Sequence, residues 1–86
     1  MSDTERSWLV EREYSDKGMV NLVYATPDGE RYLRRQLSEQ MLVRTDVTAG
    51  MDVDPERLES TAEAERERYA AEATRMADTH DIDDAV

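Results

Sequence analysis

Two turn signals in the first half of the chain constrain its fold more than any other feature. Thr26-Pro27-Asp28-Gly29 supplies a proline whose φ suits the first corner of a turn and a glycine that can adopt positive φ. The segment 15–18, Ser-Asp-Lys-Gly, repeats this chemistry without the proline. The flanking runs are rich in β-branched and aromatic residues. The sequence therefore predicts an antiparallel meander with strands over residues 8–14, 19–25 and 31–37.

The register of this meander decides which side chains share a face. Three-residue loops at both turns would place Ser15 opposite Met19 and Thr26 opposite Glu30. One face would then form the core, with Trp8, Val10, Tyr14, Val20, Leu22, Tyr24 and Tyr32. The other face would alternate apolar and charged side chains.

The chain after residue 37 offers alternatives. Ser38 could cap a short helix, or the run 41–45 could form a fourth strand, and we favour the strand. Residues 45–53 are expected to be a connection around Gly50.

A helix is expected in the last third of the chain. Asp54-Pro55 has the residues of a helix start, and Ser60 with Glu63 offers a second start through a capping box. The chain should form either one helix over about 55–79 or a single turn followed by a main helix. The acidic residues 81–86 lack a packing pattern and are expected to be a frayed tail.

These elements make one α+β domain over residues 1–86. Its predicted architecture is a three- or four-stranded antiparallel β-meander packed against a C-terminal α-helix. A chain of this length buries only roughly 60% of the surface that its unfolded form exposes, so the core should be small.

The charge pattern indicates the solvent in which the protein works. The chain has 21 acidic and 11 basic residues, a net charge of -10, and Lys17 is its only lysine. An acidic excess with arginine in place of lysine is expected of proteins that stay soluble in concentrated salt. The chain has neither an apolar run of ~20 residues nor a secretion signal, so we expect a halophilic, cytoplasmic protein and no membrane.

A resemblance agrees with this interpretation. It is carried by the segments Trp-Leu-Val-Glu-Arg at 8–12, Tyr24 to Tyr32, Asp54 to Leu58 and Arg68 to Ala70. In these the chain resembles a family of small, acidic, uncharacterised haloarchaeal proteins, over most of its length. The resemblance implies an archaeal, halophilic protein and brings no catalytic motif.

Catalysis is not predicted. The chain has no cysteine and one histidine, His80, and its three glycines form no phosphate-binding loop. A histidine at a helix end usually caps carbonyls, and the acidic tail lacks the glycine of a calcium loop. The sequence therefore predicts no enzyme, no cofactor and no metal site.

The second face of the meander is the predicted interaction surface. It has an apolar centre and a rim of opposite charges that could pair across a twofold axis. We predict a non-catalytic protein-interaction module that self-associates as a homodimer and has an unidentified protein partner. The predicted interface residues are Leu9, Glu11, Glu13, Val23, Arg31, Leu33, Arg35 and Leu37.

An alternative is a small-ligand or nucleic-acid site. Four arginines, at 31, 34, 35 and 44, form a basic island in the acidic chain. Arg34 beside Tyr24 and Tyr32 could stack on a base or hold an anionic ligand. The net charge and the loss of counterion release in high salt argue against nucleic acid.

Overall fold

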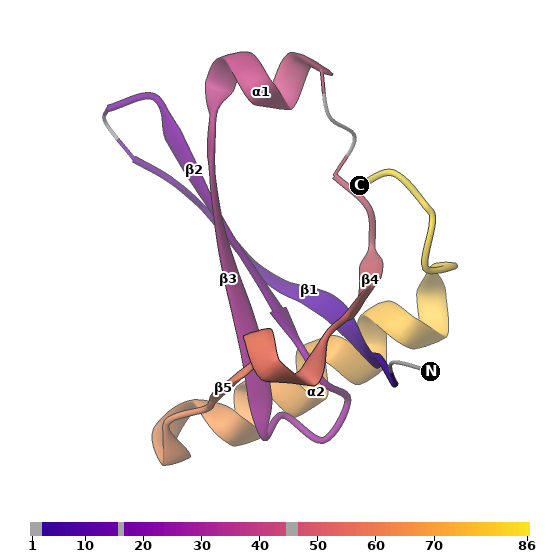
Figure 1. Cartoon of the computed structure of the whole chain (residues 1–86). Coiled ribbons are helices and arrows are strands. Elements are labelled where there is room, and N and C mark those ends of the chain that lie inside the picture. The colour runs from indigo at the N-terminus through magenta and orange to yellow at the C-terminus, as the bar shows by residue number, and fades with distance from the viewer. Residues whose placement is uncertain (1–2, 16, 45–46) are drawn as a thin grey trace.

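Two consecutive hairpins form the centre of the computed structural model, with strands β1 (Glu5–Tyr14), β2 (Met19–Ala25) and β3 (Arg31–Ser38) (Figure 1). The structure describes residues 3–15, 17–44 and 47–86, except for the side chains of residues 42–44. β2 has the predicted bounds, whereas β1 begins earlier and β3 ends one residue later.

The rest of the chain extends the sheet and covers it. It forms α1 (Glu39–Arg44), β4 (Gly50–Val53), the 3-10 turn η1 (Pro55–Arg57), β5 (Glu59–Ser60) and α2 (Glu63–Thr79). In the described part of the chain the sheet has five strands in the order β4-β1-β2-β3-β5, with every neighbouring pair antiparallel. The α+β class with a C-terminal helix is therefore confirmed, and the sheet has more strands than predicted.

The segment after β3 differs from the prediction. Residues 39–44 form α1, so the predicted strand over 41–45 is wrong, although Thr45 lies outside the described residues. Ser38 caps this helix, because its Oγ accepts a hydrogen bond from the Met41 N–H at 3.3 Å. The predicted connection over 45–53 is wrong at its end, where Gly50–Val53 pairs with β1 as β4.

The helical region follows the second alternative, a single turn and then the main helix. Asp54 Oδ1 accepts from the Glu56 N–H at 3.0 Å and caps η1. The chain is extended again at Leu58 and pairs with β3 as β5 before α2 begins. The N-cap of α2 is Ala62, without a side-chain hydrogen bond, so the predicted capping box is not formed.

The acidic tail is hydrogen-bonded, contrary to the expected fraying. Its backbone lies along residues 47–50: the Ala49 N–H donates to the Asp84 carbonyl at 2.7 Å, and the Val86 N–H donates to the Val47 carbonyl at 2.9 Å. Backbone groups can form such bonds whatever the composition of the side chains. The tail therefore covers the start of the β4 edge of the sheet, as far as Gly50 (Figure 1).

The predicted register is correct only beside the first turn. Tyr14 lies opposite Val20 as expected, but a β-bulge between Leu9 and Glu11 shifts the start of β1 by one residue. In the second hairpin Thr26 faces Arg31, with an N–H to carbonyl distance of 3.0 Å, so the loop has four residues instead of three. Since a shift of one residue moves a side chain to the other face, the predicted core face is divided.

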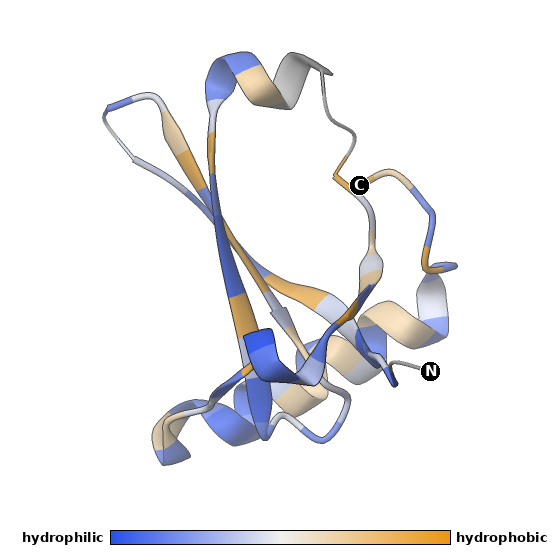
Figure 2. Cartoon of the chain, in the orientation of Figure 1, coloured by the Kyte–Doolittle hydropathy of each residue, from blue (hydrophilic) through white to orange (hydrophobic). Residues whose placement is uncertain are grey.

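Both faces of the sheet are buried. The helix face is the one that packs under Tyr69 and Ala73 of α2. The inner face is the opposite one. The sheet curls around the inner face, because residues of the distant strands β3 and β4 share one cluster there. Figure 2 shows that hydrophobic residues concentrate in the middle of the sheet. The helix face holds Trp8, Val10, Val23, Ala25 and Tyr32, and the inner face holds Leu9, Val20, Leu22, Tyr24, Leu33, Leu37 and Met51.

Candidate functional site

The eight predicted interface residues do not share a face. Glu11, Glu13 and Val23 lie on the helix face, and Leu9, Arg31, Leu33, Arg35 and Leu37 lie on the inner face. Their apolar members are core residues, since Leu9, Val23, Leu33 and Leu37 are each at most 8% exposed. The apolar centre that the sequence predicted for an interface is thus already buried within the chain.

The charged residues of the predicted interface do not form the predicted ion pairs. The Glu11 carboxylate pairs with Arg68 of α2 at 3.1 Å, and it lies on the opposite face from Arg31 and Arg35. Arg68 also pairs with Glu65 and lies 5.0 Å from the centre of the Tyr69 ring. The Glu65 hydrogen bond, followed by the one to Glu11, raises the pKa of Arg68 above its ordinary value. These contacts attach α2 to the sheet.

The alternative site of Tyr24, Tyr32 and Arg34 is not assembled. Tyr24 is 1% exposed on the inner face, and its hydroxyl donates to the Thr48 carbonyl at 3.1 Å. Burial raises the pKa of Tyr24, and the nearby Arg35 opposes that shift. Tyr32 lies on the helix face, where its ring meets the edge of Tyr69 at a centroid distance of 6.2 Å. Neither of these two tyrosines offers a free stacking surface beside Arg34.

One surface hollow lies between β1, α2 and the tail, with a volume of about 310 Å³. Its lining is mostly apolar, and its acids are already paired: Glu11 with Arg68, and Glu72 with Arg75 at 2.6 Å. Glycoside hydrolysis usually needs two carboxyl groups that converge on a substrate. The hollow does not provide them.

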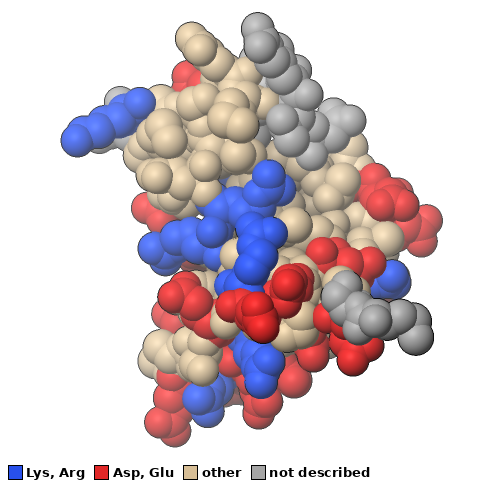
Figure 3. Space-filling view, viewed as in Figure 1, with Lys and Arg blue, Asp and Glu red and all other residues tan. Residues whose placement is uncertain are grey.

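Strand β3 carries three arginines at or near the surface. Arg31 and Arg34 are exposed and Arg35 is half-buried, and we call these three residues the edge arginines. Figure 3 shows basic side chains gathered over β3, with acidic side chains below them. No carboxylate in the described part of the chain lies within ion-pair distance of an edge arginine, whereas Arg6, Arg68 and Arg75 each have such a partner. Other described arginines also have no such partner, but they lie apart on three different elements: Arg12, Arg57 and Arg66.

The strand register places a fourth arginine, Arg12, on the same face as Arg35. Arg12 of β1 and Arg35 lie on either side of Leu22 on the inner face, and Arg12 donates to the Val86 carbonyl at 2.9 Å. The basic island was visible in the sequence, but Arg12 was not part of it. The register of the first hairpin beside its turn, which was predicted correctly, already sets Arg12 opposite Leu22. The side chain of Arg44 lies outside the described residues.

With this geometry established, comparison with known proteins places the chain. Residues 1–86 match a family of unknown function, DUF7967. The chain belongs to this family. No curated protein and no solved structure matches it. Membership of DUF7967 assigns no activity to the chain.

Two further features of this DUF7967 member concern metals and membranes. The residues that the structure describes contain no group of three or more histidine, cysteine or acidic side chains placed to hold a metal ion. Over the same residues, none of the helices combines the length and the apolar character that a membrane span requires.

Proposed function

We propose that this chain is a non-catalytic protein-interaction module that binds an acidic protein surface through the edge arginines Arg31, Arg34 and Arg35. One observation carries the proposal: in a chain with a net charge of -10, three arginines of one strand have no ion-pair partner among the described carboxylates. Arginine forms forked hydrogen bonds to carboxylates, and complementary charge fixes the orientation and register of a complex. A partner's carboxylates would supply the missing half of these pairs.

The net charge does not prevent such binding. The molecule measures 31 × 30 × 27 Å, whereas charges are screened over about 8 Å at physiological ionic strength. A ligand over Arg34 and Arg35 therefore interacts mainly with these arginines and with the few acids beside them, such as Glu59 opposite Tyr32, and only weakly with distant acids on α2.

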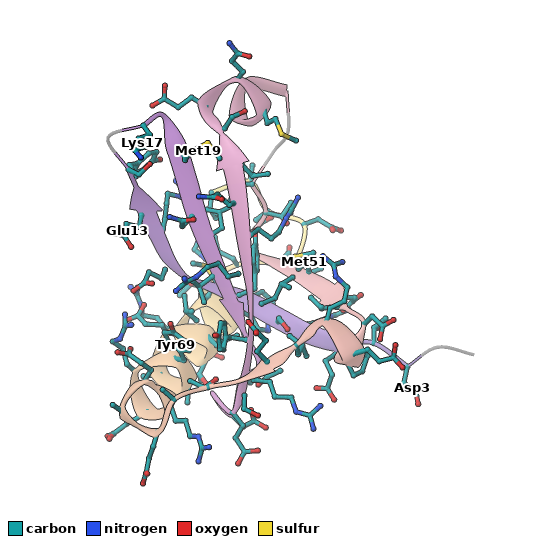
Figure 4. The ribbon with its side chains drawn as sticks, turned by 60° about the vertical axis from the view of Figure 1, so that its left-hand side comes forward. Asp3, Glu13, Lys17, Met19, Met51 and Tyr69 are labelled. Atoms are coloured by element: carbon teal, nitrogen blue, oxygen red, sulfur yellow. The ribbon has the colours of Figure 1, made fainter. Side chains whose placement is uncertain are left out.

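A titration with poly-L-glutamate tests the proposal, followed by amide chemical shifts. We expect shifts in residues 31–38, and we expect Arg34→Glu and Arg35→Glu to remove them. Lys17→Glu is the matched control, because it changes the net charge by the same amount at the far end of the first hairpin (Figure 4). Equal losses in all three variants, or stronger binding of poly-uridine RNA, would contradict a site for acidic protein.

Self-association remains a prediction, but the edge arginines do not favour it. A twofold pairing of two β3 edges would bring like charges together, which is unfavourable. Light scattering in ~2 M salt, where the screening length is below about 3 Å, tests it directly. A mass twice that of the 9.9 kDa chain would support a dimer, and a mass of one chain would rule out self-association under these conditions.

We also infer that the protein is an archaeal halophile's cytoplasmic protein, as its acidic excess and single lysine suggest. Raising salt from ~0.1 to ~2 M shortens the screening length from about 10 Å to less than 3 Å, which weakens repulsion within the chain. The melting temperature should rise over this range. A flat or falling curve in calorimetry would remove the support for a halophilic protein.

A further inference from the structure

We propose that the partner is an extended acidic segment that adds a strand to the open edge of β3, antiparallel to it and in line with β5. This inference rests on the proposed function, because it names how the edge arginines would meet their ligand. It depends on a separate feature, the backbone of β3.

The edge of β3 is open along most of its length. β5 pairs only with Arg31 and Tyr32, and the turn η1 that precedes β5 in the chain does not pair with β3. In the described part of the chain no other segment pairs with residues 33–38 on this side. A free strand edge is a template for another extended chain, and most proteins cover or shorten such edges.

The ladder shows which groups face outward. The Thr26 N–H bonds to the Arg31 carbonyl, and the Glu39 N–H bonds to the Gly18 carbonyl. Hydrogen-bonded pairs alternate along an antiparallel ladder, so Leu33, Arg35 and Leu37 direct their N–H and C=O groups toward β2. Even-numbered residues face the other way, in agreement with the bond from the Thr61 N–H to the Glu30 carbonyl.

The outward groups of the open stretch therefore belong to Arg34, Gln36 and Ser38, and the first two of these residues are exposed. Arg34 and Gln36 each provide one N–H donor and one C=O acceptor that the described chain does not use. An added strand that faces these two residues completes the ladder where β5 leaves it.

The side chains select for acid on both faces of the added strand. Arg34 projects to the helix face, and Arg35 projects to the inner face, because successive side chains of a strand alternate. A strand laid beside them would pair best with two consecutive acidic residues, one opposite each arginine. A second copy of β3 would instead bring arginines together.

A backbone ladder also suits concentrated salt. Screening weakens attraction between separated charges, whereas a main-chain hydrogen bond is a short-range contact between neutral groups. Binding that depends partly on main-chain hydrogen bonds would therefore persist in concentrated salt, where attraction between charges alone becomes too weak.

The probe is the acetylated and amidated peptide Thr-Val-Glu-Glu-Val-Thr, titrated into the full chain at ~0.1 and ~2 M salt. A second peptide has the same side chains but has methyl groups on alternate backbone nitrogens, which removes ladder donors and keeps the charge. We expect the methylated peptide to bind about tenfold more weakly or not at all.

A pair of variants tests the protein side. Gln36→Pro removes an outward N–H without removing a bond to β2, and proline is tolerated at such an edge position. Gln36→Ala keeps the N–H and is the control. We expect about a tenfold loss for the proline and less than about a twofold change for the alanine.

The outcomes separate this inference from the proposed function. If both peptides bind equally and Arg34→Glu abolishes binding, the acidic partner stands but strand addition is wrong. If neither peptide binds, strand addition is likewise wrong, and the arginines serve only to keep the edge from aggregating. The methylated peptide is tested on the unmodified protein, so the result does not depend on how Gln36→Pro folds.

Discussion

Gly29 lies where the second turn of the meander touches α2. Its φ is +74°, and an added Cβ would overlap the Arg66 carbonyl oxygen and lie 2.8 Å from the Ala70 nitrogen. Gly18 has nearly the same φ, +73°, but the nearest atoms to an added Cβ are 3.8 Å away. The two glycines thus have the same backbone conformation in different surroundings. A comparison of the two separates the cost of conformation from that of packing.

We predict that Gly18→Ala costs about 1–2 kcal/mol, the usual penalty for an alanine at positive φ. Gly29→Ala should cost about 1–3 kcal/mol more, because backbone atoms of α2 must move. Urea unfolding of both variants measures the difference. Equal losses would show that the turn does not press against the helix.

Asp28 stabilises the same turn through its charge. Its Oδ1 accepts from the Thr26 hydroxyl at 2.6 Å and from the Glu30 N–H at 2.9 Å. These bonds lower the pKa of Asp28 below its ordinary value of 3.8. Because the folded pKa is the lower one, this stabilisation is complete above about pH 5 and is lost as the pH falls through the folded pKa.

Asp28→Asn should therefore reduce stability at neutral pH but much less in acid. The difference between wild type and variant should stay constant from about pH 7 to pH 5 and then shrink below about pH 4. Urea unfolding across this range measures it. A difference that is unchanged at the lowest pH would mean that the carboxylate charge is not involved.

At the level of elements, α2 and the sheet depend on few large side chains. Trp8 is 7% exposed and packs against Ala49 and Ala73, with Met76 and Ile82 around it. Figure 4 shows Tyr69 on α2 beside the strands. Trp8 is a core residue, as predicted, and it lies under α2, whereas most of the other predicted members of the core face lie on the inner face.

Replacement of Trp8 by alanine should cost about 3–5 kcal/mol, which is a large part of the stability of a small domain. Tyr14 is the control, since it lies on the same strand and is 63% exposed. Tyr14→Ala should change stability by less than about 0.5 kcal/mol. Similar losses in the two variants, measured by thermal unfolding, would contradict the packing described for Trp8.

The sequence located the elements better than it set their register. Turn chemistry identified both hairpins, but Pro27-Asp28-Gly29 fits a loop of three residues or of four, and only the longer loop places Leu33 beside Tyr24. The bulge at the start of β1 has no local signal, because an extra residue is accommodated by packing with neighbouring strands. One residue in each hairpin was enough to divide the predicted face.

The short elements could not be predicted from their own local sequences. β4, β5 and the tail are held by pairing with distant strands, and their own sequences are too short or too acidic to indicate it. For the candidate site, the basic island was recognisable at once. Its position on an open edge depends on where β5 ends, which no spacing in the sequence shows.

At the level of the whole molecule, the two edges of the curled sheet are covered to different extents. In the described part of the chain, the tail covers the β4 side as far as Gly50 and leaves residues 51–53 open, whereas the β3 side is covered only as far as Tyr32 and is open over the longer stretch 33–38. Both proposals depend on this asymmetry, since the edge arginines and the outward backbone groups belong to the same strand.

Amide hydrogen exchange of the isolated protein tests that asymmetry most directly. Protection should alternate along β3: Arg35 and Leu37, which bond to β2, should exchange slowly, whereas Arg34 and Gln36 should exchange at rates near those of an unfolded chain. An acidic peptide bound at the edge should slow the second pair only. If Arg34 and Gln36 are as protected as their neighbours in the isolated protein, the edge is already occupied, and the proposed binding surface does not exist.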